Sequence, residues 1–426
     1  MTQVDQPELT QVPSHEEQGT GTKLVVGVVG AGTMGTGIAQ LALAAGHELI
    51  LHDVDEVAIG RARLRIEEGL TRLAAKGRLQ SGPAEALARL RTAQDLGALG
   101  GEADIVVEAA LEELELKRRI FGALDSAAAP STVLATNTSA LSVGAIAEGA
   151  LRHPERVVGL HFFNPAPVMA LVEVVAAGSS DPSAVDRAET FARGLGKTTV
   201  RCRDAPGFIV NRVNRPYTLE ALRIVEARQA TVGEIDRAME RVGFPMGPFA
   251  LMDLVGLDVN YAVARALWAA FDNAVRFEPS PIQERLVKAG HLGRKSGEGF
   301  YRYASDGRRL GPVDEFAGPE DSFLGVVGYL LAAFLGGEPA GPRLSTYDIA
   351  DLIILAILNE AHYALGEGVA STTEIDLALK LGANHPWGPF ERTAQLGADV
   401  VRKRLSSLEH QYGPRFAPAP LLREQS

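Results

Sequence analysis

The sequence predicts an α/β domain built on a doubly wound parallel sheet, followed by an all-α part made of two tandem copies of one helical module. Three observations support this fold class. Short β-branched runs alternate with longer helical patterns from residue 23 to about 203, as in a parallel sheet with helices on both faces. Beyond Pro206 these runs give way to apolar residues at helical spacing. A stretch of that helical part then recurs further along the chain.

The composition is that of an acidic chain with several hydrophobic cores. With 426 residues and 46% hydrophobic content, the chain is long enough for more than one separately packed domain. Its 42 Lys and Arg residues against 53 Asp and Glu residues give a net charge of -11, unlike a nucleic-acid-binding protein. The single cysteine, Cys202, excludes an internal disulfide and a cysteine-based metal cluster. We therefore expect a small-molecule partner, no nucleic acid and no metal site.

The ends and the linker are the least regular parts of the sequence. Residues 1–22 are polar and acidic, without the apolar stretch of a secretory signal, and they predict a disordered tail. The apolar stretch at about 323–335 is too short to cross a bilayer and predicts a buried helix. We expect a soluble, cytoplasmic protein that binds no membrane.

The helical part contains an internal repeat. Residues 230–253, ATVGEIDRAMERVGFPMGPFALMD, resemble residues 370–394, ASTTEIDLALKLGANHPWGPFERTA. The predicted boundaries are 1–22 for the disordered tail, 23–205 for the α/β domain, 206–304 for the first helical module, 305–343 for a linker with a short helix, 344–416 for a degenerate second module, and 417–426 for a loose tail.

A glycine-rich turn marks a nucleotide site at the first strand of the sheet. Gly30, Gly32 and Gly35 form G-x-G-x-x-G directly after the apolar run LVVGVV and before a predicted helix. Such glycines allow a tight turn, close approach of a pyrophosphate, and close packing of helix on strand. Thr33 and Met34 lie at the start of the predicted helix and complete the expected contacts. This context predicts a Rossmann-type dinucleotide-binding domain.

The second strand of the sheet indicates which dinucleotide binds. The run ELILHD ends at Asp53, about twenty residues after the glycine turn. A carboxylate there accepts hydrogen bonds from the ribose hydroxyls and repels a 2′-phosphate. The next basic residue is Arg61. The sequence therefore predicts NAD rather than NADP as the cofactor.

A histidine and a glutamate form the candidate catalytic pair. His161 lies at the end of an apolar strand, at the edge where doubly wound sheets bind ligands. A histidine can take a hydroxyl proton and return it, because its pKa is near working pH. Glu173 interrupts the apolar run ALVEVV, where a carboxylate is costly unless it is paired. We therefore predict that Glu173 orients the His161 imidazole.

Six strings, in this order, closely resemble the L-3-hydroxyacyl-CoA dehydrogenase family: GAGTMGTGIA, VVEAALEELELK, ATNTSAL, HFFNPAPVMALVEVV, DAPGFIVNR and GFPMGPFALMDLVGLD. The resemblance covers residues 24–303, and GRKSGEGFYRY closes the first helical module as in that family. It implies that the helical modules are of the dehydrogenase C-terminal type.

The resemblance also implies roles for individual residues. His161 would be the catalytic acid/base and Glu173 its partner, while Ser139 and Asn211 would hydrogen-bond the substrate oxygens. The positions that would line the nicotinamide side of NAD are Ser139, Glu112, Lys117 and Asn164. Lys76, on a basic predicted helix, would contact coenzyme A, although Gly69 replaces a serine that touches the coenzyme in some relatives.

The expected reaction is NAD-dependent oxidation of L-3-hydroxyacyl-CoA to 3-oxoacyl-CoA, in fatty-acid or aromatic-compound degradation. A short chain such as 3-hydroxybutyryl-CoA is the first candidate, and 3-hydroxyadipyl-CoA is the alternative. A sugar-acid dehydrogenase of the same superfamily and an NAD-binding structural protein are the remaining alternatives. Alignment of the two modules places Asp351 opposite Asn211, so the second module is expected to be structural, and the chain to be a monomer or a homodimer.

Overall fold

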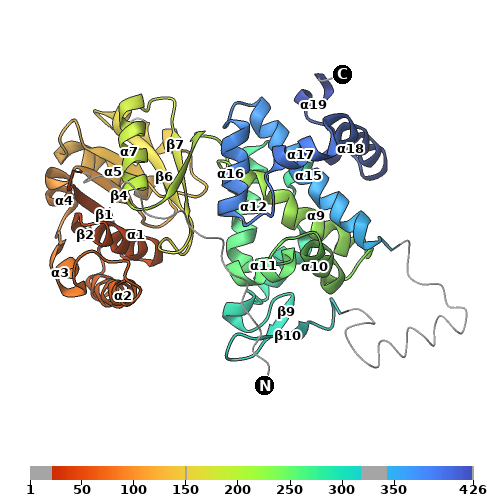
Figure 1. Cartoon of the computed structure of the whole chain (residues 1–426), viewed down its shortest axis with the longest axis horizontal. Coiled ribbons are helices and arrows are strands. Elements are labelled where there is room, and N and C mark those ends of the chain that lie inside the picture. Colours follow the sequence, from red (N-terminus) through yellow and green to blue (C-terminus); the bar gives the residue numbers. More distant parts are fainter. Residues whose placement is uncertain (1–21, 149–150, 318–342, 425–426) are drawn as a thin grey trace, which may run out of the picture.

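The computed structural model describes residues 22–148, 151–317 and 343–424, which form a sheet domain and a helical part lying side by side (Figure 1). The sheet domain runs from β1 to β8, and the helical part begins at α8. The predicted disordered tail, apart from residue 22, and the predicted linker helix at 323–335 lie outside the described residues.

The sheet domain is doubly wound, as the alternating sequence pattern predicts. Within the described residues, its sheet has the strand order β3-β2-β1-β4-β5-β6-β7-β8. Neighbouring strands are parallel except for β6 and β7, which are antiparallel. The strands are β1 (Val25–Val29), β2 (Glu48–His52), β3 (Leu90–Thr92), β4 (Ile105–Glu108), β5 (Val133–Thr136), β6 (Val157–Phe162), β7 (Leu171–Ala176) and β8 (Thr198–Arg203).

Helices cover both faces of this sheet. One face packs against α1 (Thr33–Ala44), α2 (Glu56–Ala75), α3 (Pro83–Ala88) and α7 (Pro182–Gly194). The other face packs against α4 (Leu96–Glu102), α5 (Leu114–Ala127) and α6 (Val143–Ala147). The central strands are apolar along their length because both of their faces are buried. The carboxyl ends of β1, β2, β4 and β5 therefore share one edge, where the predicted nucleotide site lies.

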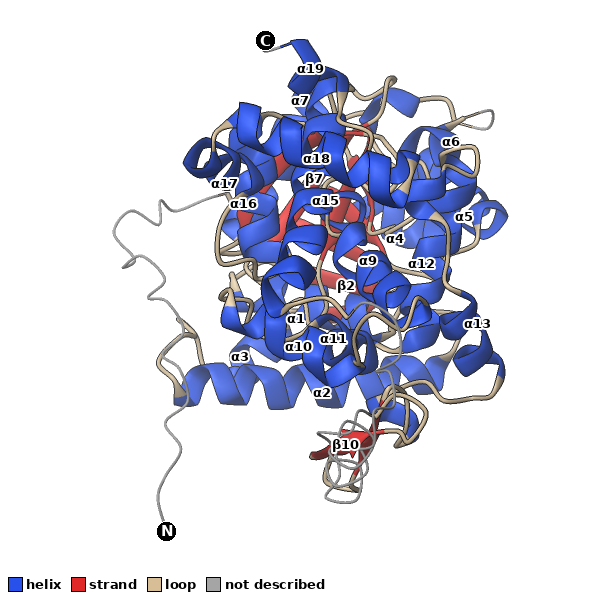
Figure 2. Ribbon diagram, turned by 90° about the vertical axis from the view of Figure 1, so that its right-hand side faces the viewer, coloured by secondary structure: helices blue, strands red, loops and turns tan. Residues whose placement is uncertain are grey.

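The helical part consists of two groups of helices, a few short 3-10 turns and one short β-hairpin. The first copy contains α8 (Val210–Val213), α9 (Arg215–Glu226), α10 (Val232–Arg241), α11 (Pro248–Val255), α12 (Leu257–Ala270) and α13 (Pro281–Lys288). The second copy contains α15 (Thr346–Gly366), α16 (Thr372–Gly382), α17 (Pro389–Leu396), α18 (Ala398–Tyr412) and α19 (Pro420–Glu424). In the view turned by 90°, in which the right-hand side of Figure 1 faces the viewer, the helical part lies in front of the sheet (Figure 2).

The two copies share the same internal hydrogen bonds. In the first copy, Asp236 accepts hydrogen bonds from the backbone N–H groups of Phe249 and Ala250 at 2.9 and 3.0 Å. In the second, Asp376 accepts from the corresponding two N–H groups at the start of α17, at 2.7 and 3.0 Å. In both copies an aspartate of one helix caps the next helix, which confirms the predicted tandem repeat.

The first copy is not wholly helical. A short hairpin pairs β9 (Tyr301–Tyr303) with β10 (Arg309–Pro312). The backbone N–H groups of Phe300 and Tyr301 donate to the Asp253 carboxylate at 3.0 and 2.9 Å, which fixes the hairpin on α11. The expectation that β structure ends before residue 206 is therefore wrong. The three residues of β9 are too few to show the alternation of a strand, and the position of β9 depends on this tertiary contact.

The loose tail predicted from residue 417 is also wrong. Residues 420–424 form α19, and Ala419 and Leu422 are buried. The Asn359 side chain on α15 donates to the Ala417 carbonyl and accepts from the Ala419 N–H, both at 2.8 Å. The prolines of APAPLL suggested a flexible end, but the apolar residues among them pack on α15.

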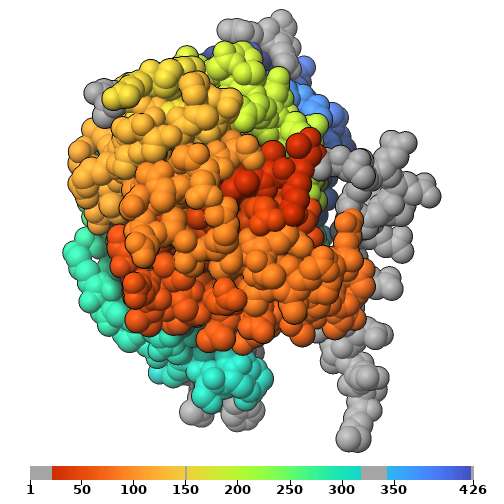
Figure 3. Space-filling model, turned by 90° about the vertical axis from the view of Figure 1, so that its left-hand side faces the viewer, coloured from red at the N-terminus to blue at the C-terminus, as the bar shows by residue number. Residues whose placement is uncertain are grey.

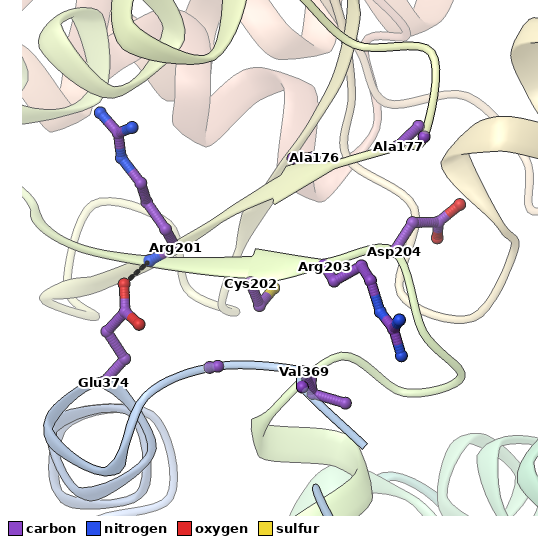
Figure 4. A pocket seen from close by; sticks show the side chains of 11 residues that line it. Ala176, Ala177, Arg201, Cys202, Arg203, Asp204, Val369 and Glu374 are labelled. Atoms are coloured by element: carbon purple, nitrogen blue, oxygen red, sulfur yellow. Dashed lines mark hydrogen bonds between the residues drawn. The ribbon is translucent and has the colours of Figure 1, made fainter. Parts of the chain in front are cut away.

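The second copy covers the edge of the sheet. β8 is the last strand of the sheet, and an open edge would leave its N–H groups unpaired. The Arg201 N–H donates to the Glu374 carboxylate at 3.0 Å, and the Arg203 N–H donates to the Val369 carbonyl at 2.8 Å (Figure 4). In the space-filling view from the sheet side, the blue second copy is visible behind the yellow-green segment at the upper edge (Figure 3).

A buried ion pair joins the two copies of the module. Arg212, at the end of α8, is fully buried and donates to Glu360 at 2.7 Å and to Glu367 at 2.7 and 2.9 Å. Both glutamates belong to the second copy, on or directly after α15. Although burial acts against the charge, these carboxylates raise the pKa of the Arg212 guanidinium. The loss of either copy would leave buried charges without partners.

The long helix α15 is the most apolar helix of the second copy. Among the described residues, it is the one helix that is long and apolar enough to cross a membrane by length and composition. In the structure 72% of its apolar window is buried, against other parts of the protein. Its apolar character is therefore accounted for by its position in the core.

His385 is buried where the second copy meets the first. Its Nε2 lies 2.8 Å from Asn214 Oδ1, and its ring contacts those of Phe244 and Trp387 at centroid distances of 4.9 and 5.8 Å. Its Nδ1 has no partner in the described part of the chain. Burial lowers the pKa of His385 to about 3.

Acid is therefore expected to destabilise this contact. The folded-state pKa of His385 lies below the ordinary value. Its contribution to folding stability is therefore fully present above about pH 6.5 and is lost as the pH falls below that value. The loss amounts to about 2 kcal/mol at about pH 5. His385→Gln should weaken the decrease in unfolding temperature between about pH 7.5 and about pH 5, whereas His410→Gln on the exposed surface should not. Equal decreases in wild type and His385→Gln would contradict this account.

Candidate active site

The glycine turn between β1 and α1 leaves room beside the backbone. Gly30 has a φ of +102°, a conformation that favours glycine. A Cβ on Gly35 would lie 1.8 Å from the Gly30 carbonyl oxygen, so only glycine allows this packing. A Cβ on Gly32 would meet nothing within 4 Å, so the space there is open. Since no side chain caps α1, its first N–H groups, at Thr33 and Met34, suit a phosphate.

Asp53 lies beside this turn, directly after β2. Its carboxylate accepts hydrogen bonds from the backbone N–H groups of Ala31 at 2.7 Å and Asp55 at 2.9 Å. These bonds fix the partly exposed carboxylate at the same edge of the sheet as the glycine turn. An open backbone turn beside a fixed carboxylate fits the pyrophosphate and ribose of NAD, the predicted cofactor.

His161 and Glu173 face each other across two strands. They are directly opposite residues in the antiparallel pairing of β6 with β7, which brings their side chains onto the same face. His161 Nδ1 lies 2.6 Å from Glu173 Oε2, and the two side chains are 5% and 0% exposed. The structure therefore joins the predicted pair by a buried hydrogen bond.

The second oxygen of Glu173 holds the helical part. Glu173 Oε1 accepts hydrogen bonds from the N–H groups of Ile209 at 3.0 Å and Val210 at 2.9 Å, at the start of α8. The preceding residue, Phe208, adopts a φ of +49°, and its ring lies 5.7 Å from that of His161. The carboxylate that contacts the histidine thus also positions the first helix of the module.

Ser139 and Asn211 meet at the other side of the imidazole. Ser139 follows β5, and its Oγ lies 3.0 Å from His161 Nε2. Asn211 is on α8, and its side-chain N–H donates to the Ser139 carbonyl at 3.3 Å. Both residues are partly exposed, unlike the buried pair of His161 and Glu173. The arrangement gives one proton-accepting nitrogen beside two polar side chains that can contact a substrate oxygen.

Glu112 fixes the loop that carries Ser139. Its Oε1 accepts hydrogen bonds from the Thr138 hydroxyl at 2.6 Å and from the N–H groups of Ser139 and Ala140 at 2.8 and 3.0 Å. Burial acts to raise the pKa of the Glu112 carboxyl, but the Lys117 ammonium and these hydrogen bonds hold it below its usual value. Glu112 is therefore a charged carboxylate at the edge of the site.

Lys117 is held at the site by Glu112 and by Glu108, and Glu108 was not predicted from the sequence. Its side chain is 1% exposed, and its ammonium contacts Glu108 at 2.7 and 2.9 Å and Glu112 at 3.3 Å. Glu108 is fully buried at the end of β4 and also accepts from the Thr136 hydroxyl at 2.7 Å. A charge at the carboxyl end of the apolar run DIVVE was the signal that could have identified it.

Two predicted positions, Lys76 and Asn164, form no side-chain hydrogen bond or ion pair with these site residues in the described part of the chain. Lys76 is the exposed C-cap residue of α2, and Asn164 is exposed beyond the end of β6. Gly69 packs against Gln40 of α1: a Cβ at residue 69 would lie 2.0 Å from the Gln40 side-chain oxygen, so a serine there would require that side chain to move.

Comparison with known families and proteins covers both parts of the chain. Residues 25–205 match the NAD-binding domain of 3-hydroxyacyl-CoA dehydrogenase, and residues 207–303 and 349–425 match its C-terminal domain. A protein of Escherichia coli K12 named 3-hydroxyadipyl-CoA dehydrogenase is 38% identical, over 94% of this chain and 97% of its own length.

Another curated relative and a solved structure carry a different substrate in their names. A 3-hydroxybutyryl-CoA dehydrogenase of Mycobacterium tuberculosis is 43% identical, over 65% of this chain and 98% of its own length. The crystal structure of 3-hydroxybutyryl-CoA dehydrogenase from Escherichia coli K12 superposes with a TM-score of 0.81 at 37% identity, covering 94% of this chain and 98% of that one. The protein described here belongs to the 3-hydroxyacyl-CoA dehydrogenase family.

Proposed function

We propose that this chain oxidises short-chain L-3-hydroxyacyl-CoA esters to 3-oxoacyl-CoA esters with NAD, reversibly, in fatty-acid or aromatic-compound degradation. 3-Hydroxybutyryl-CoA is the first candidate, and 3-hydroxyadipyl-CoA is the alternative for the same site. The observation that carries the proposal is the His161 imidazole, held between the Glu173 carboxylate and the Ser139 hydroxyl in a chain of this family. The protein acts in the cytoplasm and binds no membrane or nucleic acid.

The proton of the substrate hydroxyl passes to His161. Because the Glu173 carboxylate accepts a hydrogen bond from Nδ1–H, the other nitrogen, Nε2, is left as the proton acceptor. Glu173 then stabilises the imidazolium that forms. The glycine turn and Asp53 would hold NAD, which would supply the hydride acceptor for the carbon that bears this hydroxyl. In the reverse reaction His161 returns its proton to the 3-oxo oxygen.

Ser139 and Asn211 orient the substrate oxygens. The Ser139 hydroxyl beside His161 Nε2 can donate to the oxygen at C3, which becomes a ketone as the proton leaves. Asn211 is held beside Ser139 and can donate to the thioester carbonyl. Asn164, Glu112 and, through Glu112, Lys117 support the nicotinamide side of the cleft, and Lys76 is assigned to coenzyme A.

The direct test is a reductase assay with acetoacetyl-CoA, run beside free acetoacetate and with NADPH in place of NADH. We expect rapid loss of NADH absorbance with the CoA ester and little with free acetoacetate, because the thioester is part of the recognised group. NADPH should be a poor substitute, since Asp53 repels a 2′-phosphate. Turnover of the free acid instead would favour the sugar-acid alternative.

Replacement of the histidine tests the mechanism. His161→Gln should lower kcat by about 10² to 10⁴-fold, the usual contribution of general acid/base catalysis. NADH binding, measured by fluorescence titration, should change little, because His161 contacts the substrate oxygen and not the dinucleotide phosphates. A variant that keeps full turnover would remove His161 from the mechanism, and catalytic inactivity of the wild type with NADH bound would support a structural protein.

The second helical copy is structural in this proposal. It lacks the asparagine of the first copy: Asp351, at the corresponding position on α15, pairs with Arg404. It covers the sheet edge and pairs with Arg212, which are contacts that a partner subunit would otherwise have to supply. We expect the monomer to be fully active, with activity eluting at monomer mass in light-scattering chromatography. An obligate homodimer that separates only on unfolding would contradict this role.

A further inference from the structure

Three arginines are buried in the described part of the chain, and one of them has no carboxylate partner. Arg156 pairs with Asp125 at 2.6 Å. Arg212 pairs with two glutamates of the second copy. Arg215, three residues further on, is 6% exposed and forms no ion pair with any described residue. A buried guanidinium without a counter-ion is energetically costly, so its presence calls for an explanation.

The surroundings of Arg215 are polar but neutral. Its Nη1 reaches the Asn260 carbonyl at 3.5 Å and the Asn260 side-chain oxygen at 3.3 Å, while its Nε has no partner among the described atoms. Gln283 is fully buried and donates to the Asn260 side chain at 2.9 Å, and its own Oε1 is likewise unpaired. Burial lowers the pKa of Arg215 to about 10. A neutral protein environment thus holds a cation that an anion would stabilise.

Arg215 lies close in the chain to the residue assigned to the substrate oxygens. Asn211 is on α8, and Arg215, four residues later, begins α9 directly after the turn at Asn214. Asn260 belongs to α12, which Figure 1 shows on the side of the helical part nearest the sheet domain. α12 also packs close to the segment before α8, since a Cβ on Gly207 would lie 2.7 Å from the Leu267 side chain.

Apolar surface that suits an acyl chain lies on α12, whose Asn260 contacts Arg215, and on the preceding α11. Three apolar side chains of α11 and α12 are about half exposed, namely Leu254 at 48%, Val255 at 48% and Val259 at 49%. Val259 directly precedes Asn260 in α12. A chain of methylene groups can pack on apolar surface of this kind, and a charged group at its end requires a cation.

We infer that Arg215 is a specificity-determining residue that binds a carboxylate at the far end of the acyl chain, so that the substrates are CoA esters of dicarboxylic 3-hydroxy acids. This inference rests on the proposed function and, within it, favours the dicarboxylic alternative over 3-hydroxybutyryl-CoA. Asn260 holds the guanidinium through its two oxygens, and Gln283 orients Asn260. The planar guanidinium presents two parallel N–H groups to a carboxylate, which a methyl-ended chain cannot use.

The test compares two esters of equal chain length, 3-hydroxyadipyl-CoA and 3-hydroxyhexanoyl-CoA, which differ in the terminal carboxylate. The measured quantity is the ratio of their kcat/KM values. We expect the wild type to favour the dicarboxylic ester and Arg215→Met to lower the ratio by about 10- to 100-fold, the effect of losing a charged hydrogen-bond partner. Arg215→Lys should lower it less. Arg265→Met, on the exposed face of α12, is the matched control and should keep the wild-type ratio.

A second variant keeps the test valid if Arg215→Met does not fold. Asn260→Asp places a carboxylate of the protein beside Arg215, which competes with that of the substrate. The ratio should fall, and the unfolding temperature should rise as the guanidinium gains a partner. A wild type that favours the methyl-ended ester, or unchanged ratios in both variants while both esters react, would overturn the inference alone. If the wild type reduces acetoacetyl-CoA but turns over neither ester, the inference alone fails; if it turns over none of the three, the proposed function fails as well.

Discussion

The buried carboxylate of Glu173 is the constraint on which the rest of the site depends. It is fully buried and carries three hydrogen bonds, one with His161 and two from the backbone of Ile209 and Val210. A charge at such depth is tolerated only when its oxygens are satisfied. The pairing of β6 with β7, the orientation of the imidazole and the attachment of α8 are therefore set together. Since α8 carries Asn211, the same carboxylate determines how the helical part meets the sheet domain.

Arg212 and Arg215, two buried arginines at the start of the helical part, have different partners, and the second copy neutralises only Arg212. Arg212 is neutralised within the protein by Glu360 and Glu367, so it binds the two copies of the module together. Arg215 lies on the next turn and is given only the neutral oxygens of Asn260. Arg212 has its counter-ions within the folded chain, whereas Arg215 is inferred to receive its counter-ion from the substrate. The second copy thus stabilises the first, but among the described residues it supplies no carboxylate to Arg215, the cation that the substrate is inferred to bind.

The sequence predicted the parts of the site that depend on local spacing. The glycine turn follows from three glycines between a strand and a helix, and the pairing of His161 with Glu173 from a charge in an apolar strand. The contacts that were not predicted join residues far apart in the sequence. The capping of β8 by Glu374, the packing of residues 417–424 on α15 and the position of β9 on Asp253 all depend on tertiary placement. Propensity and periodicity carry no information about such placement.

The most direct measurement of the central claim is the turnover of Glu173→Gln. The amide oxygen of a glutamine can still accept from Ile209 and Val210, but its NH₂ group must donate to His161 Nδ1, which moves the imidazole proton to Nε2 and removes the base. We predict that kcat for acetoacetyl-CoA falls by about 10² to 10⁴-fold, with NADH binding retained and the unfolding temperature changed by only a few degrees. Turnover within a few-fold of the wild type would show that Glu173 does not determine which nitrogen of His161 carries the proton, and would contradict this mechanism.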